Sequence, residues 1–261
     1  MWEQIDAFRR QLDLGGISLG SAVTLSDPAV TEALCDSVDF LWIDLEHNPT
    51  SLESLAAHLM AAKAGKTPAL VRVPSSDVAW IKRVLDTGTE AIIVPQIRSA
   101  QEVAQVVSAC RYPPLGQRGF GPRRATNYGR QPAAEGIAQA NQRLFVAVQI
   151  ETKEALDQLD AILAVPGYDS IVIGPYDLSG SLGMLGQVQN PQIVAAVASI
   201  AQRARQAGKY VGMGMGPDLE HARQAAGQGV QWIQCGCDFG HMIGAIDTLF
   251  TRIRQGGSNP T

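Results

Sequence analysis

Charged and amide side chains stand at the ends of several short apolar runs of this sequence, where they could do chemistry. Charged groups inside apolar strands are costly unless they are paired or bound to a metal. Because five runs end in this way, the pattern indicates a shared functional site at one edge of a sheet. The residues concerned are Asp44, Glu46, His47, Arg72, Gln149, Glu151, Asp177 and Asp238.

Glu151 and Asp177 end two consecutive runs and are expected to face each other across neighbouring strands. Two carboxylates completed by water suit a hard cation such as Mg²⁺ or Mn²⁺, and a chelating substrate could fill the remaining positions. The alternative is that each carboxylate pairs with an arginine or caps the following helix. Gln149 precedes Glu151 by two residues, so both side chains should point to the same side of the strand.

His47, Arg72 and Asp86 are the other candidates for chemistry. A histidine held by a carboxylate such as Asp44 is a common general base, although His47 could equally cap the helix that follows. Arg72 could bind a carboxylate or stabilise an enolate oxygen, or form a buried ion pair with Asp44 or Glu151. Asp86 ends a helix, where negative charge is unfavourable, and needs a partner such as a histidine of the same or another subunit unless it is solvated.

The elements that must position these residues follow a strict alternation. Eight short runs rich in Val and Ile recur, and several are apolar throughout, which is typical of strands covered on both faces. Amphipathic segments with capping signals, such as Ser99–Glu102 and Asn190-Pro191, separate them. The runs are Ile17–Val23, Val38–Leu45, Ala69–Val73, Ala91–Pro95, Leu144–Ile150, Ser170–Ile173, Tyr210–Met213 and Val230–Cys235. Residues 1–261 are therefore predicted to form one domain, a TIM (β/α)8 barrel.

Composition narrows the class of protein further. The chain has 261 residues, of which 46% are hydrophobic, and a formal net charge of −4. The negative charge argues against non-specific binding of nucleic acid. No apolar run is long enough for a membrane span, and the N-terminus lacks the features of a signal peptide. We therefore expect a cytoplasmic globular protein with no nucleic-acid or membrane partner.

The segment Tyr112–Asn141 is too long for an ordinary loop between strand and helix. It could be a lid, a substrate clamp or a subunit contact.

Six short segments in a fixed order carry a resemblance to a known family. They are Trp42–His47, Val71–Pro74, Ile81–Gly88, Tyr112–Gly119, Val148–Thr152 and Gly174–Ser179. In these segments the sequence resembles the class II pyruvate-dependent aldolases of the HpcH/HpaI family, and the resemblance spans roughly residues 17–245. It implies a barrel of the phosphoenolpyruvate/pyruvate-domain type that reversibly cleaves 4-hydroxy-2-oxo acids to pyruvate and an aldehyde.

The resemblance also implies a role for each site residue. Glu151 and Asp177 would bind one divalent ion (Mg²⁺ or Mn²⁺, with Co²⁺ or Zn²⁺ as further options), whose charge stabilises the pyruvate enolate. Arg72 would hold the keto or enolate oxygen, and His47, oriented by Asp44 or Asp86, would act through water as the acid/base. Gln149 and Gly174, Pro175, Tyr176 and Asp177 would contact the 2-oxo acid, whose carboxylate meets backbone N–H groups around Tyr176 and Asp177. Tyr176 departs from the small residue that is frequent in the family and leaves the aldehyde open.

Arg123 and Arg124 of the long segment hint at an acidic or polyhydroxylated aldehyde, as in sugar-acid or homoprotocatechuate breakdown. A role of these arginines at a subunit interface is the alternative.

The resemblance further implies a homo-oligomer, a trimer or hexamer, in which a helix at about 238–254 is exchanged between subunits.

Competing functions are decarboxylation of oxaloacetate, a citrate-lyase-β-like carbon–carbon lyase acting on a CoA thioester, and a barrel kept for binding alone. A Schiff-base aldolase would need a lysine inside the barrel. Lys153 is the only lysine near a strand end.

Overall fold

A computed structural model of the chain describes residues 2–256. Eight parallel strands pair in sequence order and close into a barrel, because β1 also pairs with β8. The strands are β1 (Ser18–Val23), β2 (Phe40–Asp44), β3 (Ala69–Arg72), β4 (Ala91–Ile97), β5 (Phe145–Ile150), β6 (Ser170–Ile173), β7 (Tyr210–Met215) and β8 (Trp232–Cys237). The predicted TIM barrel is confirmed, and each strand overlaps its predicted run.

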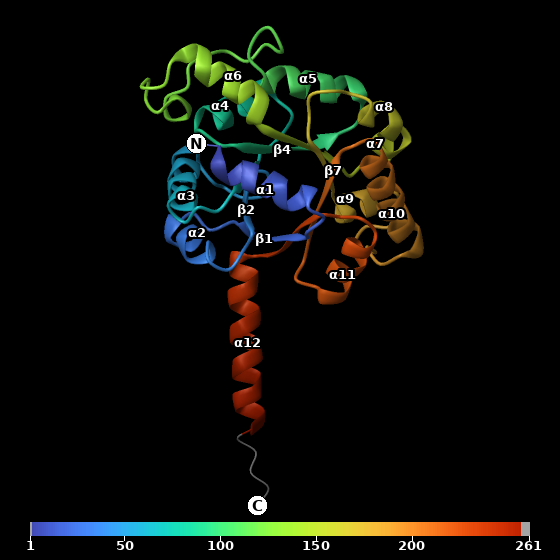
Figure 1. The fold of residues 1–261 in the computed structure, drawn as a ribbon. Coiled ribbons are helices and arrows are strands. Elements are labelled where there is room, and N and C mark those ends of the chain that lie inside the picture. The colour runs from blue at the N-terminus through green and yellow to red at the C-terminus, as the bar shows by residue number, and fades with distance from the viewer. Residues whose placement is uncertain (1, 257–261) are drawn as a thin grey trace, which may run out of the picture.

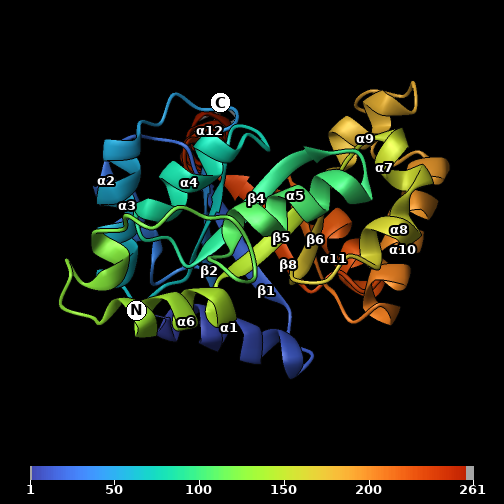
Figure 2. The same ribbon diagram turned by 90° about the horizontal axis from the view of Figure 1, so that it is seen from above.

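Helices surround the barrel (Figure 1, and from above in Figure 2). They are α1 (Glu3–Asp13), α2 (Pro28–Leu34), α3 (Leu52–Ala64), α4 (Val78–Asp86), α5 (Ala100–Cys110), η1 (Arg124–Thr126), α6 (Ala133–Arg143), α7 (Lys153–Asp157), α8 (Leu159–Leu163), α9 (Pro175–Ser181), α10 (Pro191–Gln206), α11 (Leu219–Gly227) and α12 (Asp238–Gly256). The predicted caps at Ser99 and Asn190 are present: the Ser99 side chain accepts from the N–H of Glu102, and that of Asn190 from the N–H of Gln192. Within residues 2–256, no helix combines the length and apolar character needed to cross a bilayer.

The N-terminal ends of the strands are closed by α1, a helix that the sequence patterns did not predict. Phe8 of α1 is buried and makes edge contacts with Phe40, Phe145 and Trp232, the first residues of β2, β5 and β8. Aromatic rings at such angles and separations contribute more than their buried area alone. These contacts fill the N-terminal end of the barrel interior.

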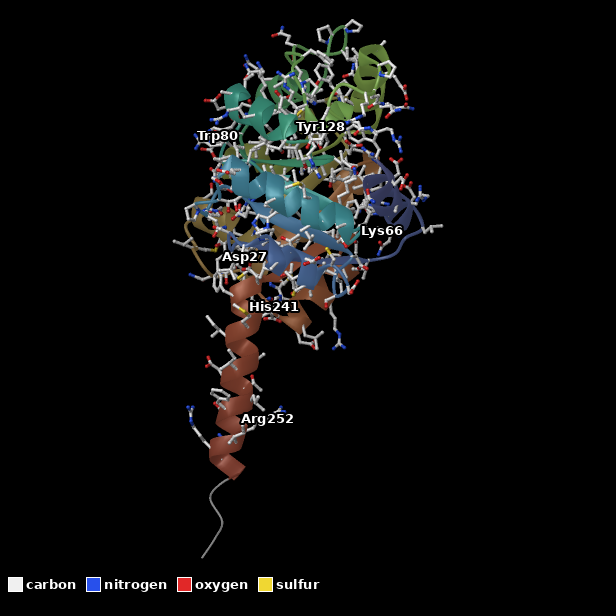
Figure 3. The ribbon with its side chains drawn as sticks, turned by 90° about the vertical axis from the view of Figure 1, so that its left-hand side faces the viewer. Asp27, Lys66, Trp80, Tyr128, His241 and Arg252 are labelled. Atoms are coloured by element: carbon white, nitrogen blue, oxygen red, sulfur yellow. The ribbon has the colours of Figure 1, made fainter. Side chains whose placement is uncertain are left out.

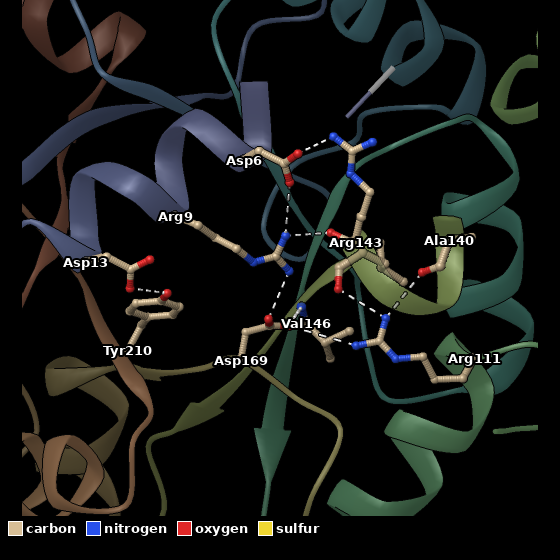
Figure 4. Close-up of polar contacts among 10 residues, drawn as sticks. Asp6, Arg9, Asp13, Arg111, Ala140, Arg143, Val146, Asp169 and Tyr210 are labelled. Atoms are coloured by element: carbon tan, nitrogen blue, oxygen red, sulfur yellow. Dashed lines mark hydrogen bonds and ion pairs between the residues drawn. The ribbon is translucent and has the colours of Figure 1, made fainter. Parts of the chain in front are cut away.

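A cluster of ion pairs fastens α1 to the barrel (Figure 4). The guanidinium of Arg9 donates to Oδ1 of Asp169 at 2.9 Å and to the carbonyl of Arg143 at 2.7 Å. Arg143 in turn pairs with Asp6. Arg111 lies beside the same Asp169 carboxylate at 3.9 Å. This network joins α1 to the connections that lead into β5 and β6 and gives the barrel a rigid base.

The last helix, α12, begins directly after β8 and projects away from the barrel (Figures 1 and 3). Its first residue, Asp238, is buried, and its carboxylate accepts hydrogen bonds from the N–H groups of Thr24 and Leu25 at 2.7 and 2.9 Å. The base of the helix is therefore fixed to the end of β1. Residues 241–255 of the helix are exposed.

Candidate active site

A pocket of about 200 Å³ lies at the carboxyl ends of the barrel strands. Its walls come from strands that are far apart in the sequence but adjacent in the barrel, which is the usual position of a TIM-barrel active site. The lining residues are Trp42, Arg72, Gln149, Gly174, Pro175, Tyr176, Asp177, Gly214, Met215, Gly216 and Gln234. Six of the predicted site residues therefore line one pocket.

Arg72 is held at this pocket by two carboxylates. Its Nε donates to Oδ1 of Asp44 at 2.7 Å, and its Nη1 lies 3.0 Å from Oε2 of Glu46. Its guanidinium also lies over the ring of Trp42. Among residues 2–256, no acceptor is recorded for Nη2, so this nitrogen is available to a ligand. The arginine is therefore fixed in position while one donor remains free.

The carboxylates around Arg72 differ in their acidity. Burial alone would raise the pKa of Asp44, but the hydrogen bond and charge of Arg72 outweigh it and hold this pKa below its usual value. Burial raises the pKa of Glu46, and the charges of Asp44 and Asp177 act in the same direction, against the charge of Arg72. Asp44 is therefore the ionised partner of Arg72, whereas the raised pKa of Glu46 reflects its burial among further carboxylates.

His47 lies at the rim of the site, with 62% of its side chain exposed. Its Nε2 is 3.6 Å from Oε2 of Glu46. The expected partner Asp44 is instead occupied by Arg72 and by the side-chain amide of Asn48, which donates at 2.8 Å. The carboxylate beside the imidazole in the described chain is therefore Glu46 and not the predicted Asp44.

Glu151 is almost completely buried at the end of β5, 1% exposed. Its Oε1 accepts from the N–H of Gln96 at 2.7 Å, and its Oε2 accepts from Nε2 of Gln149 at 2.5 Å. The predicted common orientation of Gln149 and Glu151 is confirmed. The Oε1 of Gln149 is buried without a hydrogen-bond partner in the part of the chain that the structure describes.

The contact from Gln96 depends on an irregularity in β4. The pairing of β4 with β5 shifts between Val94 and Ile97, and Gln96 has a φ of +59°. A non-glycine residue in this region is uncommon, and bulges of this kind often lie beside active sites. The bulge turns the Gln96 N–H toward Glu151 and so positions a residue that the strand pattern did not single out.

The burial of Glu151 and the negative charges around it favour the binding of a cation. Burial raises its pKa to about 7, and the charges of Glu46 and Asp177 act in the same direction. Within residues 2–256, no group of three or more His, Cys, Asp or Glu side chains is arranged to hold a metal alone. Mg²⁺ commonly uses one or two carboxylates and completes its shell with water and substrate. Glu151 and Asp177 fit that pattern, and a bound cation would relieve the surplus negative charge.

Gly174 follows β6 and allows the close approach of two strands at this point. A Cβ placed there would lie 2.6 Å from Oε2 of Glu151 and 2.9 Å from Nε2 of Gln149. Because such contacts are too short, any other residue would displace the Glu151 carboxylate. Pro175 then starts α9, and Tyr176, which is 54% exposed, stands at the mouth of the pocket.

Asp86 does not join this group within one chain. It ends α4, at the opposite end of the helix from the carboxyl ends of the strands, and its carboxylate pairs with Arg118 at 3.1 Å. The ring of Tyr112 lies against the same arginine. A contact between Asp86 and His47 would therefore require a second copy of the chain.

The segment Tyr112–Asn141 is not a lid over the pocket. It connects α5 to β5, contains η1 and most of α6, and runs to the N-terminal ends of the strands. Arg124 donates to the carbonyl of Leu59 at 2.9 Å there, and Tyr128 lies on the side of the barrel away from α12 (Figure 3). Within the described chain, Arg124 therefore lies at the other end of the barrel from the pocket of Arg72 and does not reach it, and its alternative role at a subunit interface stays a prediction.

A second and larger pocket, of about 420 Å³, lies beneath this segment. It is bordered by Ala69, the first residue of β3, and by Glu90, which precedes β4, and it includes Lys63 and Arg124. None of the residues predicted to bind the metal or to act in catalysis lines it, whereas Arg72 and Asp177 line the smaller pocket.

Comparison with known proteins identifies the family of the chain. The profile of the HpcH/HpaI aldolase/citrate lyase family matches residues 23–245. The chain is 37% identical to a 4-hydroxy-2-oxovalerate aldolase of Rhodococcus jostii, over 98% of both chains. It is 34% identical to a 2-keto-3-deoxy-L-rhamnonate aldolase of Escherichia coli, over 97% of this chain and 95% of the relative.

A solved structure from Burkholderia cenocepacia, described as an HpcH/HpaI aldolase/citrate lyase family protein, superimposes with a TM-score of 0.89 at 31% identity. The superposition covers 95% of this chain and 99% of that one. The matches extend over the whole barrel and over every segment that carries the site. The chain belongs to the HpcH/HpaI aldolase/citrate lyase family.

Proposed function

We propose that the protein is a metal-dependent class II aldolase that cleaves 4-hydroxy-2-oxo acids to pyruvate and an aldehyde, and catalyses the reverse addition. The observation that carries the proposal is one pocket lined by Asp177 and by Arg72, which keeps a free donor, with the buried carboxylate of Glu151 directly behind its lining residue Gln149. The carboxylates suit a divalent cation and the arginine a substrate oxygen. The names of the relatives support the same class of reaction.

Glu151 and Asp177 would hold the ion, which we propose to be Mg²⁺ or Mn²⁺. When bound, the ion supplies positive charge beside the oxygens of the 2-oxo acid, which favours negative charge on the keto group. The Gln96 N–H and the Gln149 amide keep the Glu151 carboxylate in one orientation. Such outer contacts tune the affinity of a metal ligand.

Arg72 would donate from Nη2 to the keto oxygen of the substrate. Because Asp44 and Glu46 fix the other two nitrogens, the donor is in place before the substrate arrives. Preorganised donors of this kind contribute much of the catalytic effect at sites that develop negative charge. The backbone N–H groups of Tyr176 and Asp177, at the start of α9, would receive the carboxylate.

His47 would exchange the proton of the C4 hydroxyl through a water molecule. In the cleavage direction this hydroxyl loses its proton, the bond between C3 and C4 breaks, and C3 later gains a proton to give pyruvate. In the described chain the imidazole lies beside Glu46. We propose that Asp86 reaches His47 only from another subunit, because its own chain holds it at the far end of the barrel.

The projecting helix α12 supports a homo-oligomer, which we propose to be a trimer or hexamer with α12 exchanged between subunits. Its apolar side chains recur at helical spacing and are about half exposed. They are Phe239, Met242, Ile243, Ile246, Leu249, Phe250 and Ile253. An apolar stripe of this kind on a single chain indicates a contact with another surface.

The proposal is tested by coupling pyruvate release to lactate dehydrogenase. The panel contains several 4-hydroxy-2-oxo acids and oxaloacetate, each with Mg²⁺, with Mn²⁺ and with EDTA. We expect EDTA-sensitive release of pyruvate from the hydroxy-oxo acids. Activity on oxaloacetate alone would make the protein a decarboxylase, and EDTA-resistant cleavage would contradict the metal assignment.

A further inference from the structure

The catalytic pocket has a second wall that the mechanism above does not use. Gly214, Met215 and Gly216 at the end of β7 and Gln234 on β8 line the same 200 Å³ space as Arg72 and Asp177. If a 2-oxo acid is held by Arg72 and the carboxylates, the fragment beyond C3 extends toward the remaining lining. The β7–β8 wall is therefore the surface that can distinguish one aldehyde from another.

The side chain of Gln234 is oriented by two backbone carbonyl groups. Its Nε2 donates to the carbonyl of Gly236 at 2.5 Å and to that of Met215 at 3.4 Å. Since both partners are acceptors, the amide nitrogen must face them, and the orientation of the amide is fixed by this network. The oxygen Oε1 consequently points the other way.

Oε1 of Gln234 is an available acceptor beside the pocket. No donor to it is recorded among the residues that the structure describes, and the side chain is partly exposed. A Cβ on Gly214 would lie 3.1 Å from this oxygen and 3.8 Å from the ring of Trp42. Because Gly214 has no side chain, Oε1 of Gln234 has room to lie at this position.

The chemistry of this wall favours one kind of aldehyde. The amide carbonyl is a neutral acceptor, and no cationic side chain lines the β7–β8 part of the pocket among the described residues. Such a group binds a hydroxyl donor, whereas an alkyl group placed there would leave the carbonyl without a partner. Sites built to pair with a hydroxyl reject analogues that lack it.

We propose that Gln234 is a specificity-determining residue that accepts a hydrogen bond from a hydroxyl group on the aldehyde fragment. The enzyme then prefers hydroxylated aldehydes to alkyl aldehydes of the same size. This inference rests on the proposed aldolase function, because it assigns the second substrate of that same site.

The test compares glycolaldehyde with propionaldehyde, which differ only by a hydroxyl in place of a methyl group. The kcat/KM for their addition to pyruvate is measured in the wild-type protein and in Gln234→Leu. We expect the wild type to prefer glycolaldehyde, and Gln234→Leu to lower the ratio about tenfold through glycolaldehyde alone. The matched control Gln192→Leu, at an exposed position on α10, should leave the ratio unchanged.

A second variant covers the case in which Gln234→Leu fails to fold. Gly214→Ala places a methyl group against Oε1 and should lower the same ratio without touching the Nε2 contacts. Circular dichroism shows whether each variant folds. An unchanged ratio in folded variants would overturn the role of Gln234. Exchange of the pyruvate methyl protons with D₂O by the wild type, measured without any aldehyde, tests the proposed function separately, and a wild type without exchange would contradict that function.

Discussion

Asp44 and Arg72 are register partners on the adjacent strands β2 and β3, and their side chains meet at 2.7 Å between Oδ1 and Nε. Each is the last residue of its strand. The barrel therefore sets this ion pair through its hydrogen-bonding register, independently of any loop. Because the pair is fixed by the sheet, the remaining donor of Arg72 has a defined direction, which a site on a flexible segment could not guarantee.

Arg72→Lys should not preserve activity. An ammonium group carries the same charge but cannot bond Asp44 and Glu46 while keeping a third donor for the substrate. We expect kcat/KM to fall by about 10²–10³-fold with little change in thermal stability. Steady-state kinetics and differential scanning calorimetry check this. Turnover close to that of the wild type would remove Arg72 from the mechanism.

Gly174→Ala should weaken metal binding although residue 174 is not itself a proposed ligand. Its new methyl group would lie 2.6 Å from Oε2 of Glu151, so the carboxylate must move. We expect the Mn²⁺ dissociation constant, measured by calorimetry, to rise by about tenfold or more. Gly227→Ala on α11, where a Cβ meets nothing within 4 Å, is the control. Equal affinity in both variants would argue that Glu151 does not bind the metal.

Glu90 gives a dependence of stability on pH that is separate from the active site. Burial is the main cause that raises its pKa from the usual 4.5 of a glutamic acid to about 7. A carboxyl with a raised folded-state pKa binds its proton more tightly in the folded protein. Its unfavourable effect is therefore absent below about pH 4.5, grows as pH rises between the two pKa values, and is complete above about pH 7.

Glu90→Gln should consequently stabilise the protein at pH 8 and have little effect near pH 4.5. After allowance for partial exposure, we expect a gain of about 2 kcal/mol at pH 8 in the free energy of unfolding. Urea unfolding at both pH values measures it. A variant that is no more stable at pH 8 than the wild type would show that the carboxylate is well solvated or paired.

The apolar stripe of α12 should control the oligomeric state. Ile246→Asp places a charge in the middle of the stripe, whereas Thr251→Asp places one on the opposite side of the same helix. Light scattering coupled to size exclusion is expected to show dissociation for the first variant and no change for the second. An oligomer that survives Ile246→Asp would mean that α12 does not form the interface.

The barrel could be predicted from the sequence because each strand is a continuous apolar run. Phe145 to Val148, for example, is buried on both faces, so its composition differs sharply from that of the helices. The residues at strand ends followed from the same pattern, since a polar residue such as Gln149 interrupts an apolar run visibly. The helix α1 escaped prediction because only Ile5, Phe8 and Leu12 of its residues are buried.

Other features depend on geometry that no local pattern carries. Gln96 acts through its backbone N–H, which reaches Glu151 only because β4 bulges, and the one available signal was Pro95 inside a strand. The sequence placed Glu46 at the end of a strand, but its contacts with Arg72 and His47 depend on the path of the chain after β2. The sequence did not show that Arg118 pairs with Asp86, or that Arg124 lies at the N-terminal ends of the strands, because no local pattern reveals which end of the barrel a connection reaches.

The central claim is that Glu151 binds a metal that is required for chemistry at the pyruvate methyl group. Exchange of the methyl protons of pyruvate with D₂O, followed by NMR for the wild type and Glu151→Gln with and without Mn²⁺, tests it most directly. We predict Mn²⁺-dependent exchange in the wild type, loss of exchange in the variant, and an unchanged circular dichroism spectrum. Exchange that persists in Glu151→Gln, or that resists EDTA in the wild type, would contradict the account.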